Sequence, residues 1–354
     1  MMISKIHDGH DNFFTPLRII MAIMVVFGHA AVVLAGNSDV EPRLFLEYTP
    51  SYTAVNAFFI VSGFLVTKSM MYRKDLAAYS AARILRIFPA LLIHVLIVTL
   101  VVGLLFTTLS IGQYFTHPDV FLQPLKVLSF YETDMELPGA FANNPESIGS
   151  AALWTLRYEV LAYIATAIAF ALGLLNRRWK IAAQYIVCAI AYPLALRTGL
   201  YDALPATGQA LLRFGMAYGL GAAIYAYREQ IKVHLLAIPA LFGLAYLLKG
   251  QPEVEIVFNL AIAMTVFWLA YVKAPKLNFL QKFSDVSYGI YIYHWAILQC
   301  IVALNPAINS LPLTLITIAI STIIAWLSWV IIEKPALASK ARLARFFARK
   351  TSAA

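Results

Sequence analysis

An arginine and a histidine lie eleven positions apart at the start of the first apolar segment of the chain. Arg18 follows Leu17, where this segment begins, and His29 lies inside it. Eleven helical steps of about 100° return to within ~20° of the starting direction, so both side chains share one helix face, roughly 16 Å apart. Ionisable groups inside a membrane are costly and usually functional. The spacing therefore predicts a conduit, with a cation that grips an anionic group at one end and proton chemistry at the other.

A carboxylate in the fourth apolar segment is expected at the depth of His29. His29 lies about seven residues, or ~10 Å, below the outer end of its segment, and Glu159 about six residues, or ~9 Å. A carboxylate beside an imidazole holds its tautomer and supports the imidazolium, as a general base requires. We therefore predict His29 and Glu159 as catalytic residues. The spacing agrees equally well with a buried pair that only pins two helices together.

Three arginines are expected near one mouth of this conduit. Arg83 and Arg86 are three positions apart, so they share a helix face. They lie just before the third apolar segment, at the level where Arg18 enters the first. Guanidinium groups bind phosphate bidentately, which predicts that Arg18, Arg83 and Arg86 bind a phosphate-bearing ligand. The alternative is that each is an ordinary cation reaching a lipid headgroup.

Small and polar side chains in two other segments are candidates for lining a ligand site. The sequence FFIVSGFL, from Phe58 to Leu65, places Ser62 near mid-membrane beside a glycine. Such a small pair lets another helix or a ligand approach closely, and packing is favoured over a nucleophilic serine. The sequence SYGIYIYHW, from Ser287 to Trp295, places Tyr291 and His294 on one face. They either line a cavity or are interfacial aromatics beside a satisfied histidine.

The elements that must position these residues are membrane-spanning helices. Of 354 residues, 61% are hydrophobic and only 13% charged, against about 25% charged in a soluble domain; the mean hydropathy is +0.75. Apolar stretches of about 20 residues recur from end to end, which predicts an all-α, polytopic bundle of about ten transmembrane helices. The predicted spans are residues 17–36, 52–71, 89–109, 153–175, 181–199, 207–227, 233–249, 254–272, 287–304 and 311–332. We expect residues 1–335 to form one membrane domain and 336–354 a basic cytoplasmic tail.

Cations concentrate in alternate loops of this predicted topology. The richer loops and the tail include Arg73, Lys74, Arg83, Arg86, Arg177, Arg178, Lys180, Arg228, Lys232, Lys273, Lys276, Lys282, Lys334, Lys340, Arg342 and Arg345. By the positive-inside rule these loops and both termini are cytoplasmic. The net charge of +9 then reflects topology and lipid headgroups, and nucleic acid is not expected as a partner. The two cysteines, Cys188 and Cys300, show no metal spacing, so no metal is expected.

Several motifs, occurring in order over nearly the whole chain, resemble those of the integral-membrane acyltransferase family 3. They are Arg18 and His29 with ten residues between them, FFIVSGFL, ARILRIFPAL with Arg83 and Arg86, LWTLRYEVLAYI with Glu159, SYGIYIYHW, and IEKPAL with Glu333. Many relatives also carry a C-terminal hydrolase-like domain. Because only a short basic segment follows the last predicted span here, we expect the stand-alone form.

Two departures from the family pattern bear on the acceptor. Ala54 and Asn56 stand where many relatives have glycine and an acidic residue, and Arg157 is bulkier and more charged than usual at its position. Both differences are expected to alter the choice of acceptor. Asn56 therefore joins Ser62, Tyr291 and His294 as a predicted substrate-binding residue.

The resemblance implies an enzyme that moves an acyl group, usually acetyl, from acyl-CoA on the cytoplasmic side to a hydroxyl of a cell-envelope saccharide. Acetyl-CoA or another acyl-CoA would be the co-substrate, and a saccharide or lipid-linked saccharide the acceptor. Arg18, Arg83 and Arg86 would hold coenzyme A phosphates, and His29, oriented by Glu159, would serve acyl transfer. Direct transfer and a transient acyl-histidine both remain open.

We expect a multi-pass protein of the bacterial inner (plasma) membrane whose other partners are membrane lipids. The alternative function is a polytopic transporter or flippase for a lipid-linked sugar. Such a protein would move its substrate without covalent change.

Overall fold

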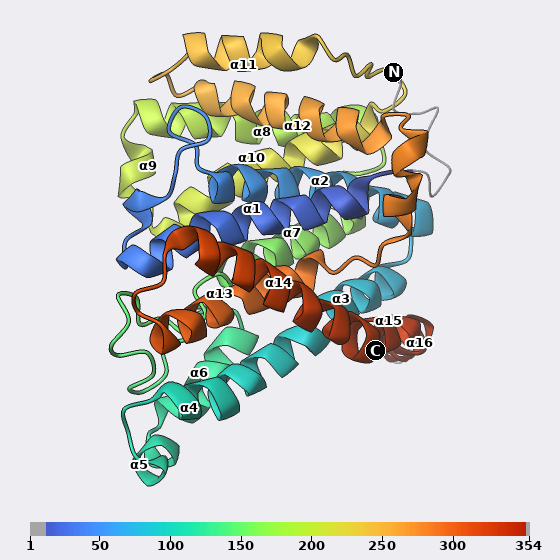
Figure 1. Cartoon of the computed structure of the whole chain (residues 1–354). Helices are drawn as coiled ribbons and strands as arrows, with labels where there is room; N and C mark the ends of the chain where they lie inside the picture. Colours follow the sequence, from blue (N-terminus) through green and yellow to red (C-terminus); the bar gives the residue numbers. More distant parts are fainter. Residues whose placement is uncertain (1–11, 352–354) are drawn as a thin grey trace. The chain divides into compact units, whose positions relative to one another are not determined.

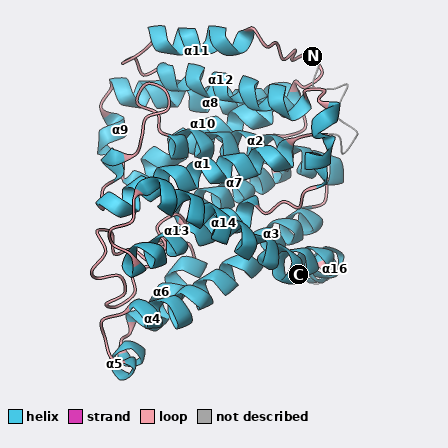
Figure 2. Ribbon diagram, viewed as in Figure 1, coloured by secondary structure: helices cyan, strands magenta, loops and turns pink. Residues whose placement is uncertain are grey.

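The fold is helical throughout the part of the chain that the structure describes. The computed structural model describes residues 12–351, and no strand forms among them (Figures 1 and 2). The α-helices are α1 (Phe14–Ala35), α2 (Pro50–Arg73), α3 (Leu76–Ile97), α4 (Leu104–Phe106), α5 (Ile111–Thr116), α6 (Asp119–Leu128), α7 (Trp154–Ala171), α8 (Arg178–Arg197), α9 (Leu200–Ala203), α10 (Ala206–Ala226), α11 (Ala237–Leu247), α12 (Val254–Tyr271), α13 (Ser287–Leu304), α14 (Ser310–Ser328), α15 (Lys334–Ala338) and α16 (Lys340–Thr351). Short 3-10 helices cover Ser38–Val40 and Pro275–Lys282, and π-helical segments cover Val98–Gly103 and Trp329–Glu333. The predicted all-α class is confirmed.

Each predicted span coincides with a helix, and the polytopic architecture is confirmed. Within the described residues, seven helical stretches are long and apolar enough to cross a membrane. They are Phe14–Ala35, Pro50–Arg73, Leu76–Phe106, Arg178–Arg197, Val254–Tyr271, Ser287–Leu304 and Ser310–Ala348. Helix α11 is apolar but shorter. The count of ten remains a prediction, as does the cytoplasmic placement of the termini, since residues 1–11 and 352–354 lie outside the described part.

The chain divides into two compact units. Of the described residues, the first contains 12–21, Tyr52–Leu76 and Tyr158–Phe283, and the second contains Ala22–Ser51, Ala77–Arg157 and 284–351. Helix α1 contributes its beginning to the first unit and its remainder, from Ala22, to the second. The boundaries expected for one membrane domain and a tail remain a prediction.

In the first unit, helices pack closely where glycine removes the side chain. A Cβ added at Gly63 on α2 would lie 2.0 Å from the carbonyl oxygen of Tyr218 on α10. One added at Gly221 on α10 would lie 1.9 Å from the carbonyl oxygen of Ile60 on α2. Packing in lipid depends on van der Waals contact between such small surfaces. The close approach of a second helix expected at Ser62–Gly63 is therefore observed at Gly63.

In the second unit, α13 and α14 lie side by side (Figure 1). In the same unit, α1 ends just before a glycine, Gly36. Gly36 has a φ of +65°, and its amide donates to the carbonyl oxygen of Val32 at 2.8 Å. A left-handed residue just after a helix is the usual place for glycine. A Cβ at Gly36 would also lie 2.3 Å from the carbonyl oxygen of Pro145. The helix end and the loop before α7 can meet only because this residue has no side chain.

The connection between the third and fourth predicted spans, residues 110–152, contains ordered structure in the second unit. Oγ of Ser110 accepts a hydrogen bond from the amide of Gln113 and so caps α5, while Oε1 of Gln113 accepts from the amide of Ser110. The hydroxyl of Tyr114 donates to the carbonyl oxygen of Thr99 at 2.8 Å, which ties α5 to the π-helical segment. Burial raises the pKa of Tyr114 to about 12, so the hydroxyl stays a donor at neutral pH.

Candidate functional site

Helix α13 is fixed in the second unit by the hydroxyl groups of three tyrosines. The hydroxyl of Tyr288 donates to a backbone carbonyl of α3 at 2.9 Å. The hydroxyls of Tyr291 and of Thr155, at the start of α7, are 2.5 Å apart. The hydroxyl of Tyr293 donates to Oγ of Ser328 on α14 at 3.1 Å. A helix held on several sides in this way is buried all round, and its rotation about its own axis is fixed.

The imidazole rings of His29 on α1 and His294 on α13 meet in the second unit. Nδ1 of His29 lies 2.9 Å from Nε2 of His294, and the ring planes are 23° apart. His294 is 0% exposed, and its Nδ1 lies 2.7 Å from the carbonyl oxygen of Tyr291 and 3.2 Å from that of Ile290. The structure thus brings together two residues predicted separately, one as catalytic and one as substrate-binding.

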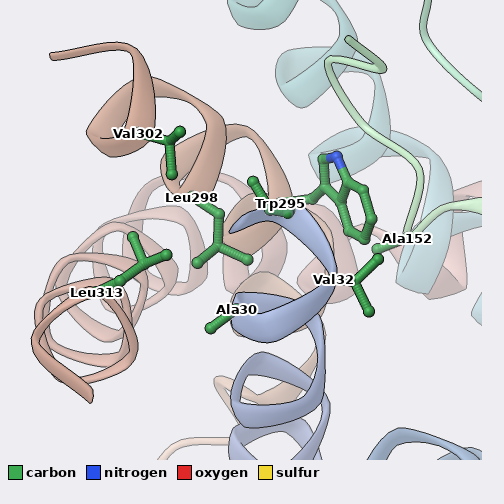
Figure 3. Close-up of a cluster of buried hydrophobic side chains, with 8 residues drawn as sticks. Ala30, Val32, Ala152, Trp295, Leu298, Val302 and Leu313 are labelled. Carbon is green, nitrogen blue, oxygen red and sulfur yellow. The ribbon is translucent and has the colours of Figure 1, made fainter. Parts of the chain in front are cut away.

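An apolar cluster sets the separation of α1 and α13 around this pair (Figure 3). Its members are Ala30, Val32, Val33, Ala152, Trp295, Leu298, Val302 and Leu313. The indole of Trp295 lies edge-on to the ring of His29, with centroids 4.9 Å apart. Its Nε1 donates to the carbonyl oxygen of Ile148 at 2.8 Å. The residue after His294 therefore packs against the imidazole of His29 and anchors the loop before α7.

The same loop is held to α13 by a buried glutamine. Nε2 of Gln299 donates to the carbonyl oxygens of Glu146 and Ile148 at 2.9 and 2.8 Å. Nδ2 of Asn144 donates back to Oε1 of Gln299 at 2.7 Å. Gln299 is 0% exposed, and a buried amide whose donors and acceptor are all used stabilises a single arrangement. The loop is fixed about one and a half turns of α13 beyond His294.

Two polar residues in the second unit had no role in the sequence-based predictions. Nε2 of buried His94 lies 3.1 Å from Oγ of Ser150. The carboxylate of Glu41 accepts from the amide and hydroxyl of Ser51 at 2.8 and 2.6 Å, and occupies the space that a side chain at Gly28 would need. His94 and Ser150 are 56 positions apart. Glu41 and Ser51 both lie in the connection between the first two predicted spans, where no helical period relates them. Within residues 12–351, no cluster of three or more His, Cys, Asp or Glu could hold a metal ion.

Arg86 on α3 shares its guanidinium between two carboxylates of the second unit. Its two terminal nitrogens lie 3.0 Å from Oδ2 of Asp285 and 3.2 Å from Oε2 of Glu333. The side chain of Arg86 is 13% exposed, that of Asp285 18% and that of Glu333 1%. The rings of Tyr288 and Trp329 lie 5.5 and 5.9 Å from the guanidinium carbon. This ion network fastens α3 to the start of α13 and to the π-helical turn after α14.

The other two predicted phosphate ligands lie in different units. Arg83 is in the second unit, one turn before Arg86 on α3, and its guanidinium carbon lies 6.0 Å from the ring centroid of Tyr79. Arg18, on the beginning of α1, belongs to the first unit. A common phosphate site for the three arginines remains a prediction.

The predicted residues Glu159 and Ser62 also belong to the first unit. The carboxylate of Glu159 accepts a hydrogen bond from the hydroxyl of Tyr163, one turn later on α7. Ser62 is half-buried on α2 beside Gly63. The pairing of Glu159 with His29 remains a prediction, as does the contact of Ser62 with an acceptor.

Asn56 lies in a buried polar network of the first unit. Its Nδ2 donates to Oε1 of Glu255 at 2.9 Å and to Oδ1 of Asn259 at 3.1 Å, and its Oδ1 accepts from Nε of Arg213 at 3.0 Å. The guanidinium carbon of Arg213 is 3.3 Å from the ring centroid of Tyr52. This network was not predicted from the sequence, although an arginine and a glutamate within apolar helices are a functional signal. The role of Asn56 in acceptor binding stays a prediction.

The first unit also contains a cavity of about 220 Å³ between α2, α7, α8 and α10. Its lining is mostly apolar and includes Phe59, Tyr158, Leu161, Phe214 and Ala222. Two lining hydroxyls, of Thr166 and Tyr218, are 2.6 Å apart and hydrogen-bonded to each other. The mostly apolar lining suits a hydrocarbon group better than a charged or polar one.

The chain belongs to the family described as "Acyltransferase domain", whose model matches residues 12–330. It is 28% identical over 357 residues to nodulation protein 10 of Rhizobium leguminosarum bv. viciae, covering 93% of this chain and 94% of that protein. It is 25% identical over 342 residues to an O-acetyl transferase of Shigella phage Sf6, covering 92% and 95%. No solved structure matches. The resemblance seen in the motifs is confirmed, and with its span-length helices the protein is a membrane acyltransferase.

Proposed function

We propose that this protein is an acyl-CoA-dependent O-acyltransferase that transfers acetyl, or a related acyl group, to a hydroxyl of a cell-envelope saccharide in the bacterial inner membrane. The similarity to an O-acetyl transferase supports the reaction class. The observation that carries the proposal is the placement of His29. It is a half-buried imidazole on an apolar helix, hydrogen-bonded to His294, within the matched family domain.

In the proposed reaction, His29 takes the proton of the acceptor hydroxyl as that oxygen attacks the thioester carbon. The new ester O–C bond forms, the C–S bond breaks, and the leaving thiolate takes the proton from the imidazolium to give free coenzyme A. A positioned general base contributes roughly 10²–10⁴-fold to such a rate. An acyl-histidine route would use the same residue as nucleophile.

We propose that the phosphates of coenzyme A bind Arg18, Arg83 and Arg86 through the fork geometry that arginine offers. Arg83 is the stronger candidate on α3. The charge of Arg86 is offset by Asp285 and Glu333, which would also repel a phosphate beside it. Glu159 remains the proposed carboxylate partner of the base.

We propose that Ser62, Asn56 and Tyr291 bind the acceptor. The hydroxyl of Tyr291 is bound to Thr155, so a sugar would have to share or replace that hydrogen bond. A saccharide offers both donors and acceptors, which makes such an exchange feasible at small cost.

The test is acyl transfer by purified protein in lipid nanodiscs. Protein is incubated with acetyl-CoA labelled in the acetyl group and with bacterial envelope glycan, and ester-linked label in the glycan is counted before and after mild alkali. We expect His29→Ala to lower transfer roughly 10²–10⁴-fold. His117→Ala is the matched control, because His117 is 43% exposed at the end of α5.

Two outcomes would contradict the proposal. Near-wild-type transfer by His29→Ala would remove His29 as the base. If wild-type protein moves no label but carries a lipid-linked sugar across vesicles, the protein is a transporter instead.

A further inference from the structure

We propose that His294 is a positioning residue that holds His29 in the tautomer with a proton on Nδ1 and a lone pair on Nε2. This inference rests on the proposed function of His29 as base. It reassigns His294 from acceptor binding to the support of the base.

The tautomer of His294 follows from its hydrogen bonds to its own helix. Nδ1 lies 2.7 Å from the carbonyl oxygen of Tyr291 and 3.2 Å from that of Ile290. A carbonyl oxygen can only accept, so Nδ1 of His294 carries a proton. In a neutral imidazole the other nitrogen then holds a lone pair. Since the ring is 0% exposed, the neutral form is the one that burial favours.

The tautomer of His29 follows in turn. Nε2 of His294 is an acceptor, and its partner at 2.9 Å is Nδ1 of His29. That nitrogen must therefore donate a proton, which leaves the lone pair of His29 on Nε2. The proton positions of both rings are thus set by two backbone carbonyls of α13.

The arrangement matches what a general base needs through a catalytic cycle. When Nε2 of His29 takes a proton from the acceptor, its Nδ1–H continues to donate to His294, so no hydrogen bond must be exchanged. In serine hydrolases a carboxylate holds the histidine tautomer in the same way. Here the hydrogen-bonded partner is a neutral imidazole, which fixes orientation and tautomer. Both ring nitrogens of His29 are then used, so Glu159, the carboxylate proposed above, would support the imidazolium through its charge and not through a hydrogen bond to the ring.

The positioning ring is itself held from several sides. The hydroxyls of Tyr288, Tyr291 and Tyr293 bind neighbouring elements, and Trp295 packs edge-on against His29. Supporting contacts of this kind keep a base within a fraction of an ångström of its productive geometry.

Two substitutions separate the hydrogen bonds of His294. His294→Gln places an amide oxygen near the position of Nε2, where it can accept from His29. His294→Asn places an amide near the position of Nδ1, where it can donate to Tyr291 but leaves His29 without its acceptor. We expect His294→Asn to lower kcat about 10- to 100-fold with KM for acetyl-CoA unchanged. His294→Gln should retain most of the wild-type kcat.

A second measurement reads the tautomer directly in the wild-type protein. The protein is labelled with ¹⁵N-histidine in nanodiscs, and the ring nitrogens of His29 are assigned in solid-state NMR spectra by difference from His29→Gln. We expect protonated Nδ1 and unprotonated Nε2 in wild type and in His294→Gln. His294→Asn should shift the population toward the Nε2-protonated form.

The outcomes distinguish this inference from the proposed function. Protonated Nε2 on His29 in wild type, or full kcat in His294→Asn, overturns the positioning role of His294 even if acyl transfer is robust. Absence of acyl transfer by wild type overturns the proposed function, while the NMR result still decides the tautomer. If both variants fail to fold, the wild-type spectrum by itself shows which ring nitrogen of His29 is protonated, and so supports or overturns the inference.

Discussion

Replacing Arg86 by methionine tests whether its ion network holds the second unit together. The change removes the cation that both Asp285 and Glu333 contact and leaves their two carboxylates, 18% and 1% exposed, without it. Removing one partner of a buried ion network costs about 3–5 kcal/mol, because the remaining charge is uncompensated. Glu333→Gln leaves Arg86 bound to Asp285 and should cost less, about 1.5–3 kcal/mol for a lost charge-assisted hydrogen bond.

The double variant tests whether the three residues act as one network. In Arg86→Met with Glu333→Gln, one carboxylate has lost the cation of Arg86 instead of two. The combined cost should therefore fall short of the sum of the single costs by about 0.5–3 kcal/mol, as expected for residues in one network. Arg197→Met is the control, because Arg197 pairs with Glu253 at 2.7 Å while 58% exposed, and exposed pairs contribute about 0–1 kcal/mol.

The melting temperatures of wild type and of these variants, measured in the same detergent, give the order of their stabilities. Cys188 and Cys300 are partly buried free thiols, so a thiol-reactive fluorophore reports their exposure as the protein unfolds. We expect Arg86→Met to be the least stable single variant and Arg197→Met to match wild type. Wild-type stability in Arg86→Met, combined with a raised KM for acetyl-CoA, would refute the reasoning and identify Arg86 chiefly as a phosphate ligand.

Two further outcomes are expected. Gly63→Ala should lower the free energy of unfolding by about 1–3 kcal/mol, because its Cβ would meet the backbone of Tyr218. Gly243→Ala is the control, because a Cβ there has open space. Equal melting temperatures for the two variants would contradict this prediction. Burial and the neighbouring Glu136 raise the pKa of Asp134 above 3.8. Between the pKa values of the unfolded and folded states, the folded state binds more protons than the unfolded state. The free energy of unfolding therefore falls as pH rises through this interval. Asp134→Asn should therefore stabilise at pH 7 and not at pH 3, measured by thermal unfolding.

The helical architecture could be predicted because its signals are local. Runs of about 20 apolar residues mark each span, and all ten predicted spans coincide with helices. Boundaries shifted where a helix continues past its apolar run. Helix α3 begins at Leu76, well before the predicted start at residue 89, because the polar turns around Arg83 are also helical. The division into two units, with α1 contributing to both, has no local signal in the sequence.

The candidate site was only partly predictable. His29 and His294 could be identified as ionisable residues within apolar segments, and Arg83 and Arg86 as neighbours on one helix face. Their partners could not be identified, because a helical period relates residues three or four apart and says nothing of contacts between distant helices.

The sequence by itself determined that the chain is a helical membrane protein, which residue types lie in its spans, and which motifs it shares with acyltransferases. The tertiary structure alone decided that His29 meets His294 across 265 positions, and that Arg86 meets Asp285 and Glu333 across 199 and 247 positions. The physical reason is that hydropathy and helix propensity act along the chain. The tautomer of a buried imidazole and the partners of a buried cation depend on which helices pack together.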